Sequence, residues 1–406
     1  VEAARELFPA LNANLRGNIP VFLDGPGGAQ LPQSVLQAIN DYFIKGNSNL
    51  GGAFASSKHT EQVVEKGREQ AKTLLNAVSS NNIVFDANMT SLTFKLSRAI
   101  SRDWQATDEI LVTALDHYSN VSSWQHAAAD KGATVHQVRI DPTNCNLDYA
   151  HLESLINTNT RLIALTYASN TSGSIVDLQR VIHKAKSVGA MVYVDAVHYV
   201  PHRLVDVQQL GCDFLLCSAY KFFGPHLGIA YVADPWLEQL KPYKVEPATN
   251  LGPGRFETGT QSFAAIAGMS AAIDYMADWN LQQNKRAALT ASFEQFSAHE
   301  KALSEHFLER LAAHPQATLY GESSLQRTHM RTATFSLRWP NTQPQQIAAM
   351  LGEHNIATWH GHFYAQGMME QLGLMDKGGV LRVGFMHYNT HQEVDRLWEL
   401  FDRYCA

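Results

Sequence analysis

Short apolar runs alternate with helical patterns through the middle of the chain, and this alternation limits the fold most strongly. The apolar runs are rich in Val, Ile, Leu and Tyr and lack polar residues at every second position, as in strands covered on both faces. Helical stretches such as Leu178–Ser187, which the natural helix stop Gly189 follows, lie between them. Repeated strand–helix units predict an α/β fold with a mostly parallel, doubly wound sheet. The predicted strands are Ile110–Ala114, Thr134–Val138, Leu162–Tyr167, Met191–Asp195, Phe214–Ser218 and Gly228–Val232.

The pattern changes after about residue 265, and the 406 residues are enough for two or three domains. We predict an N-terminal arm over residues 1–20, a large domain over 21–265 and a smaller α+β domain over 266–406, against which the arm packs. The elements expected in the smaller domain are a long helical stretch over Ser270–Ala313, a strand at Arg331–Leu337, a helix at Pro344–His354, a strand at Val380–Gly384 and a last helix over Gln392–Tyr404.

Composition excludes several classes of partner. The net charge of −6 argues against a grip on the phosphate backbone of nucleic acids, and we expect no nucleic-acid partner. No apolar run is long enough to span a membrane, no polybasic patch is present, and the first twenty residues lack the apolar core of a signal peptide. Four cysteines without a CxxC pair are typical of a reduced protein, so we expect a cytoplasmic location.

Two charged residues directly follow neighbouring predicted strands. Asp195 ends the Met191–Asp195 strand, and Lys221 follows the Phe214–Ser218 strand among aromatic residues. Ligands of open parallel sheets bind beyond the carboxyl ends of the strands. Pyridoxal 5′-phosphate (PLP) needs a lysine for its Schiff base and a carboxylate that keeps its ring nitrogen protonated. The pair therefore predicts a PLP site.

Other residues at the same edge suit the remaining parts of PLP and of an amino-acid substrate. The helix that begins near Asn88–Ser91 offers an N-terminus for the phosphate, and Ser218 and Thr260 offer hydroxyl groups. His117 is placed to stack on the ring, and Asn170 to hydrogen-bond the ring hydroxyl. Arg382 is a candidate for binding a substrate carboxylate, because a guanidinium group matches a carboxylate with two hydrogen bonds.

Simpler interpretations exist for several of these residues. Asn170 also fits a turn, and Asp195 also fits a helix cap. The Gly25–Gly28 loop lacks the spacing of a dinucleotide-binding motif, and we expect it to let the backbone approach a substrate. His198 and His202 have a spacing that suits metal ligands, but no HExxH motif or cysteine cluster accompanies them. We therefore predict no metal site.

The motifs together resemble the class V aminotransferase family, and most closely its cysteine desulfurase branch. They are Asp195-Ala-Val-His198, Ser218-Ala-Tyr-Lys221, Arg255-Phe-Glu-Thr-Gly-Thr260 and Arg382 followed by Tyr388-Asn-Thr390, and the match begins at Phe22-Leu-Asp24. The resemblance implies fold type I, with a large PLP domain, a small C-terminal domain and a homodimer whose active sites lie at the interface.

The resemblance also implies a role for individual residues. Lys221 would be the Schiff-base lysine and general base, Asp195 would pair with the pyridine nitrogen, and His117 would stack on the ring. Asn170 and His198 would flank the ring hydroxyl. The phosphate would be held by Met89, Thr90, Ser218 and Tyr220, and by Thr260 of the other subunit. The substrate would meet Arg382, Tyr364 and His362.

Three departures from the desulfurases bear on the reaction. Desulfurases carry a glutamine in place of His198, a histidine in place of Tyr220 and, on a mobile loop, a cysteine that accepts sulfur. Here the loop segment 359–366 contains Tyr364 but no cysteine. A persulfide mechanism lacks its nucleophile.

The leading hypothesis is therefore PLP-dependent β-elimination on a small amino acid with sulfur at Cβ, as in a cysteine or cystine lyase. An aminotransferase and a desulfurase with an external sulfur acceptor remain open as alternatives. A non-catalytic PLP-binding protein is a further alternative, although the chain has no basic segment that would bind DNA.

Overall fold

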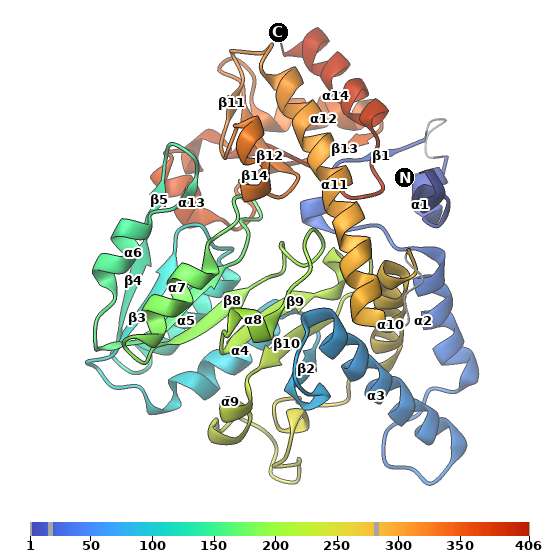
Figure 1. The fold of residues 1–406 in the computed structure, drawn as a ribbon, viewed down its shortest axis with the longest axis vertical. Helices are drawn as coiled ribbons and strands as arrows, with labels where there is room; N and C mark the ends of the chain where they lie inside the picture. Colours follow the sequence, from blue (N-terminus) through green and yellow to red (C-terminus); the bar gives the residue numbers. More distant parts are fainter. Residues whose placement is uncertain (1, 15–18, 280–283, 406) are drawn as a thin grey trace.

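A mixed sheet forms the centre of the molecule, with helices on both faces (Figure 1). We describe it from a computed structural model, which covers residues 2–14, 19–279 and 284–405. In spatial order, the strands of the sheet in these residues are β2 (Ile83–Asp86), β10 (Gly228–Val232), β9 (Phe214–Ser218), β8 (Met191–Asp195), β7 (Thr160–Thr166), β3 (Glu109–Thr113) and β4 (Thr134–Val138). β10 runs antiparallel to β2 and β9, and the other neighbours are parallel. The predicted α/β fold is confirmed, with one reversed strand.

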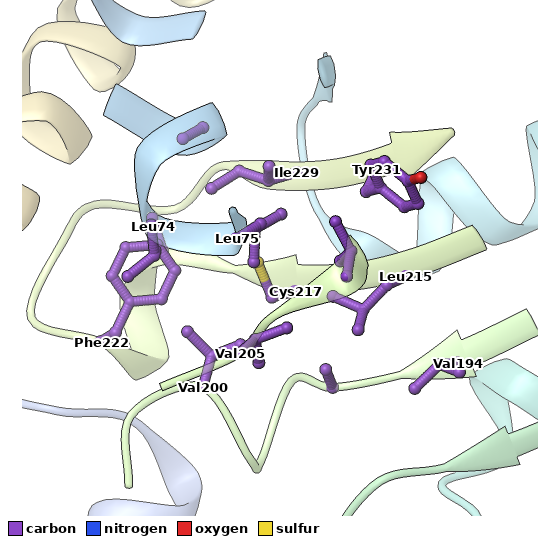
Figure 2. Packing of buried hydrophobic residues seen from close by; sticks show 14 of the residues in the cluster. Leu74, Leu75, Val194, Val200, Val205, Leu215, Cys217, Phe222, Ile229 and Tyr231 are labelled. Atoms are coloured by element: carbon purple, nitrogen blue, oxygen red, sulfur yellow. The ribbon is translucent and has the colours of Figure 1, made fainter. Parts of the chain in front are cut away.

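Both faces of the central sheet are buried, which explains why its strands lack an alternating pattern. In β8, Val192 and Val194 join one hydrophobic cluster, whereas Tyr193 between them joins a second cluster. Figure 2 shows part of the first cluster, with Leu74 and Leu75 of α3 and Cys217 of β9 among its members. The side chains on both faces of β8 thus have apolar neighbours.

Helices cover the sheet on both faces. Those that follow or precede its strands are α4 (Met89–Ile100), α5 (Ser119–Ala129), α6 (Tyr149–Leu155), α7 (Leu178–Lys186), α8 (Val207–Leu210) and α9 (Asp234–Gln239). Three further helices pack together at one side of the sheet, with α10 (Phe263–Ala277) against both α2 (Gln33–Lys45) and α3 (Ala55–Leu75). No described helix has the length and apolarity that crossing a bilayer requires.

The C-terminal part forms a second, smaller sheet with its own hydrophobic cluster (Figure 1). Its strand order is β11 (Thr318–Leu319), β12 (Thr334–Arg338), β15 (Val380–Gly384) and β14 (Trp359–Gly361). The helices of this part are α11 (Lys285–Leu311), α12 (Pro344–Glu353), α13 (Gln366–Gln371) and α14 (His391–Tyr404). The short strand β1 (Val21–Phe22) pairs in parallel with β13 (Ile356–Ala357), which brings the start of the chain to this part.

The described residues near the start of the chain lie against the C-terminal part. Helix α1 (Glu2–Glu6) carries Arg5, whose guanidinium forms an ion pair of 2.8 Å with Glu393. The Phe8 ring is fully buried, and its centroid lies 5.1 Å from that of Tyr388. Phe8 also packs edge-on against Phe223, which follows β9, so the arm contacts both sheets.

The predicted helical stretch Ser270–Ala313 is wrong as a single element. Helix α10 ends at Ala277 and α11 begins at Lys285, and residues 280–283 lie outside the described part. The Asn284 side chain accepts a hydrogen bond of 2.8 Å from the Arg286 backbone N–H, which makes Asn284 the N-cap of α11. The remaining boundaries differ from the predicted ones by a few residues, as in the strand that begins at Thr334 rather than Arg331.

Strands β5 (Ile140–Asp141) and β6 (Asn146–Leu147) follow β4 in the chain and pair with each other as a short antiparallel hairpin. The single-turn helices are η1 (Pro9–Asn12), η2 (Gly25–Gly27), η3 (Ser80–Asn82), η4 (Ser101–Asp103), η5 (Ala219–Lys221), η6 (Pro253–Arg255), η7 (Leu325–Met330) and η8 (Met375–Lys377). Two of them, η2 and η5, contact each other and border the cavity described next.

Candidate active site

A cavity of about 300 Å³ lies at the carboxyl ends of β7, β8 and β9. The C-terminal part closes it through Arg382 of β15 and the residues that follow β14. The cavity-lining residues are Pro26, Gly27, Asn88, Met89, Thr90, His117, Ser119, Thr166, Ala168, Asn170, Asp195, Val197, His198, Ser218, Tyr220, Lys221, Trp359, Phe363, Tyr364 and Arg382. The cavity therefore lies where the sequence predicts a ligand, beyond the carboxyl ends of the parallel strands.

Lys221 lies in the single turn η5 directly after β9 and is 8% exposed. Its ammonium group donates a hydrogen bond to the Pro26 carbonyl oxygen. Burial and the positive charge of Arg382 together lower the pKa of Lys221 to about 7, although the negative charges of Asp195 and Asp24 oppose them. Near neutral pH a large share of Lys221 is therefore an uncharged amine, which is the nucleophilic form.

Asp195 is the last residue of β8 and is 4% exposed. Its Oδ1 accepts a hydrogen bond of 2.9 Å from the Val197 backbone N–H. Burial raises the pKa of Asp195 to about 6, although the Val197 hydrogen bond and Lys221 both favour the charged form. A buried carboxylate of this kind gains from a positively charged ring nitrogen placed beside it.

The start of helix α4 forms another side of the cavity. Asn88 caps the helix by accepting a hydrogen bond of 2.9 Å from the Ser91 backbone N–H. The Met89 backbone N–H donates to Ser218 Oγ at 3.2 Å, which joins the helix start to the end of β9. Backbone N–H groups at a helix N-terminus favour a phosphate, and the Thr90 and Ser218 hydroxyl groups lie beside them.

His117 follows β3 and borders the cavity with its ring near that of Tyr364, at a centroid distance of 5.1 Å. Its Nδ1 accepts a hydrogen bond of 3.1 Å from the Ser119 backbone N–H. Burial, together with the charges of Lys221 and Arg382, lowers the pKa of His117 to about 4. A neutral, flat ring at this place is suited to stacking on a bound ring.

Asn170 and His198 lie between the two sheets. Asn170 donates a hydrogen bond of 3.0 Å to the Phe363 carbonyl oxygen. His198 is 3% exposed, and its Nε2 lies 3.1 Å from Thr332 Oγ1 and 2.9 Å from Thr334 Oγ1. Burial lowers the pKa of His198 well below its usual value, so the ring is neutral.

Arg382 is 5% exposed and reaches the cavity from β15. One of its terminal nitrogens donates to the Asn170 carbonyl oxygen at 2.8 Å, and its guanidinium carbon lies 4.0 Å from the centre of the Phe363 ring. Its Nε has no hydrogen-bond partner among the described residues. Burial lowers its pKa to about 9, so the group remains charged at neutral pH with a spare donor.

Trp359, Phe363 and Tyr364 form an aromatic wall opposite the sheet edge. Phe363 and Tyr364 adopt left-handed φ angles of 51° and 56°, which are rare for such side chains. The Tyr364 carbonyl oxygen accepts a hydrogen bond of 2.8 Å from the Tyr118 backbone N–H, which ties the turn to α5. The wall thus occupies the segment in which the sequence lacks a cysteine.

Two of the predicted site residues lie outside the cavity. His362 does not line it, and its Nδ1 accepts a hydrogen bond of 3.1 Å from the Tyr364 backbone N–H. Thr260 borders a separate hollow with Tyr42 and Phe43. The structure of one chain brings the other predicted residues together but leaves these two apart.

Asp24 does not line the cavity, but it lies close enough to Arg382 and Lys221 for their charges to act on it, and no role was predicted for it from the sequence. Burial raises its pKa to about 6, while Arg382 and a hydrogen bond with Trp359 favour its charged form. Its Oδ1 has no hydrogen-bond partner among the described residues. The β1–β13 pairing carries Asp24 to the C-terminal part, and no local pattern predicts that pairing.

These residues fit PLP. A buried lysine and a buried carboxylate lie at neighbouring strand ends, and a helix N-terminus with hydroxyl groups lies beside them. His198 Nδ1 is buried and unpartnered within the described ranges, so a spare ring nitrogen lies at the cavity. No group of three or more His, Cys, Asp or Glu side chains in the described residues is arranged to hold a metal ion.

Comparison with known proteins agrees with this chemistry. The chain is 31% identical over 407 residues to an aminotransferase-like protein of Gibberella zeae, with 98% of this chain and 96% of that protein covered. It is 30% identical over 416 residues to a cysteine desulfurase of Salmonella agona, with coverage of 98% and 96%. The crystal structure of the Escherichia coli cysteine desulfurase CsdA matches with a TM-score of 0.85 at 27% identity, covering 99% of this chain and 97% of that one.

The family profile described as aminotransferase class-V matches residues 21–397. This range contains Lys221, Asp195 and Arg382, and it begins at β1 and ends within α14. The profile and the full-length relatives lead to one conclusion: the chain belongs to the class V aminotransferase family of PLP-dependent enzymes.

Proposed function

We propose that this enzyme cleaves the C–S bond of a cysteine-like amino acid by β-elimination. The observation that carries the proposal is a cavity equipped for removing a Cα proton but without a thiol to accept sulfur. The four cysteines all belong to the described residues, all are buried, and none of them lines the cavity. Burial raises the pKa of Cys145 and Cys212 to about 12 and that of Cys405 to about 11, and it also raises the pKa of Cys217. None of them is a reactive thiolate at neutral pH.

The chemistry of the first step follows from Lys221 and Asp195. PLP, when bound, supplies the electron sink that stabilises a carbanion at Cα. Lys221 would hold the cofactor, and the free amine of its Nζ would remove the Cα proton of the substrate. Its pKa near 7 suits a general base, because the free amine is present at neutral pH. Asp195 holds the positive charge on the ring nitrogen, which strengthens the sink.

Arg382 orients the substrate. Its charged guanidinium group has an Nε donor without a hydrogen-bond partner in the described part of the chain, and the Phe363 ring lies over the group. A carboxylate bound edge-on to this group takes two hydrogen bonds. Asp24 lies close enough to Arg382 for its negative charge to raise the pKa of the guanidinium group. This charge balances that of Arg382 before a substrate carboxylate binds.

The atoms and electrons of the elimination balance with water as the only other reactant. The Cα proton goes to Lys221 Nζ, and the electron pair of the C–H bond forms the Cα–Cβ double bond. The C–S bond breaks, and its electron pair leaves with sulfur as sulfide, which takes up a proton. The unsaturated amine that remains is hydrolysed to pyruvate and ammonia.

The names of the relatives favour a second candidate. Proteins called cysteine desulfurases match nearly the whole chain at about 30% identity, so desulfuration with an external thiol acceptor is the alternative. The product would then be alanine, and sulfur would leave on the acceptor. The two candidates share Lys221, Asp195 and Arg382 and differ only after the Cα proton has been removed.

We further propose that two copies of the chain complete the site. Thr260 lies apart from the cavity, so its predicted contact with the phosphate requires a second subunit. Phe43, Ile44 and Phe54 are 56%, 72% and 58% exposed in a single chain, and an apolar surface of this kind suits an interface. The free cysteines suit a reducing compartment, so we place the enzyme in the cytoplasm.

Product analysis tests the reaction. PLP-loaded enzyme is incubated with L-cysteine and, separately, with L-cystine, and the products are identified by mass spectrometry. We expect pyruvate and ammonia in equal amounts, and the Lys221→Ala variant loaded with PLP measures the background of the cofactor alone. Alanine in place of pyruvate would contradict elimination and support desulfuration, and a keto acid formed with the amino group retained on the cofactor would support transamination.

A further inference from the structure

A buried histidine–carboxylate pair lies directly behind the cavity, in contact with His198. His202 Nδ1 lies 2.8 Å from Glu300 Oε2, and the two side chains are 1% and 2% exposed. The His202 ring meets the His198 ring edge to face, with centroids 5.1 Å apart and planes at 70°. His198 lines the cavity, whereas Glu300 belongs to α11, so the three side chains connect that helix to the site.

The hydrogen bonds of His198 leave one of its nitrogens free. Its Nε2 contacts the hydroxyl groups of Thr332 and Thr334, and its Nδ1 has no partner among the described residues. A neutral imidazole carries its proton on one nitrogen only, so the neighbours of the ring decide which nitrogen donates. His202 is the neighbour that packs against the ring itself.

The burial of the pair calls for an explanation other than stability. Removing two charged or polar groups from water is costly, and apolar side chains of similar size often stabilise a fold as well or better. Helix α11 contributes to a second histidine–carboxylate pair for comparison, in which its His306 lies 2.7 Å from Asp395 of α14. That pair is 28% and 45% exposed and lies away from the cavity residues.

We propose that Glu300 and His202 are positioning residues for the cofactor site. The Glu300 carboxylate accepts a hydrogen bond from His202 Nδ1 and thereby fixes the His202 ring. That ring in turn fixes the orientation and the neutral state of His198 at the cavity. The inference rests on PLP binding beside His198 and is independent of whether elimination or desulfuration follows.

Several charged or titratable groups face these rings from the elements packed around them. Lys221 and Arg382 act on His198 from the cavity. His387, which follows β15, is close enough for its pKa to respond to His202. The negative charge of Glu300 acts in the opposite direction and raises the pKa of His299 of α11, although burial lowers that pKa more strongly. A test must therefore show that His202 and Glu300 act on the cofactor through His198, and not only by changing the charge near the cavity.

The test replaces the pair by apolar side chains in the variant His202→Phe/Glu300→Leu. The readouts are the pH midpoint of the visible absorption of the lysine-bound cofactor and the dissociation constant of PLP, with the melting temperature as a check on folding. We expect the midpoint to move and PLP to bind about tenfold more weakly, as when a residue that orients a ligand group is lost. If the double variant does not fold, Glu300→Gln is measured instead, with a shift in the same direction expected.

Two controls make the test specific. The matched variant His306→Phe/Asp395→Leu removes a more exposed pair between α11 and α14 and should leave both readouts at their wild-type values. In a His198→Gln background, replacing His202 and Glu300 should cause no further shift, because their action passes through His198. A folded variant with the wild-type midpoint and PLP affinity would overturn the proposal, and so would an equal shift in the His198→Gln background.

Discussion

The two sides of the cavity are built in different ways. On the sheet side, Asp195 and Lys221 are almost fully buried at the ends of strands whose register places them. On the opposite side, Trp359 and Tyr364 of the aromatic wall are 53% and 65% exposed, and a left-handed turn holds Phe363 and Tyr364. In the proposed reaction, the sheet side carries the groups that activate Cα, and the wall carries the contacts that a substrate side chain would meet. We infer that the first side sets the rate of the shared step and that the second sets which substrate and product are chosen.

The largest effect is expected on the sheet side, in Lys221→Ala. Loss of the amine removes both the attachment of PLP and the general base, so turnover should fall by about a thousandfold or more. The measurement is kcat with L-cysteine, at saturating PLP. The matched control Lys241→Ala removes an exposed lysine and should retain the wild-type rate. Near-normal turnover by Lys221→Ala would show that the Cα proton goes elsewhere.

A smaller effect is expected in Asp195→Asn. The amide keeps the size of the side chain but lacks the charge that stabilises a protonated ring nitrogen, so kcat should fall by about a hundredfold. The visible absorption of the bound cofactor should change as well, because the charge beside its ring is lost. Asp130→Asn, at the exposed end of α5, serves as the control. Unchanged kcat would remove Asp195 from the chemistry.

On the wall side, Phe363→Ala should act on substrate binding rather than on the chemical step. The ring lies over the Arg382 guanidinium group, and such a contact is worth about 0.5 to 2 kcal/mol. We expect KM for L-cysteine to rise about threefold to tenfold with kcat little changed. Phe363→Tyr, which keeps the ring, should restore the wild-type KM. A loss confined to kcat would contradict the division between the two sides.

The smallest effect concerns stability in the protein without PLP. Burial holds the pKa of Lys221 at about 7, below its ordinary value of 10.5. Between these pH values the unfolded chain binds a proton that the folded chain lacks, so this group makes the fold more stable as pH rises. The effect amounts to about 1.4 kcal/mol per pH unit at most. Relative to Lys221→Met, the melting temperature of the PLP-free wild type should therefore rise between pH 7 and pH 9, and a constant difference would contradict the burial of a titrating amine.

The comparison also explains which features the sequence could predict. Asp195 and Lys221 directly follow apolar strands, and a parallel sheet brings consecutive strand ends to one edge, so local patterns were enough to pair them. The α/β fold was predictable for the same reason, from strands buried on both faces. Helix α3 was not predicted, because its exposed side carries many polar residues and weakens the apolar pattern.

The wall and its neighbours depend on contacts between distant segments. Asp24 reaches Arg382 only because β1 pairs with β13, and that pairing joins residues more than three hundred positions apart. The positive φ angles at Phe363 and Tyr364 direct Tyr364 to the cavity and leave His362 outside it, although both were expected to meet the substrate. Phe and Tyr are not residue types that favour left-handed φ angles, so the sequence carried no signal for the turn at these two positions.

The most direct test of the central claim is the mass of the intact enzyme, quenched during turnover with L-cysteine, together with the identity of the product. The account predicts an enzyme that gains no sulfur atom while pyruvate accumulates, because all four cysteines are buried away from the cavity. An enzyme that gains the mass of one sulfur, located on a cysteine-containing peptide, with alanine as the product, would contradict it.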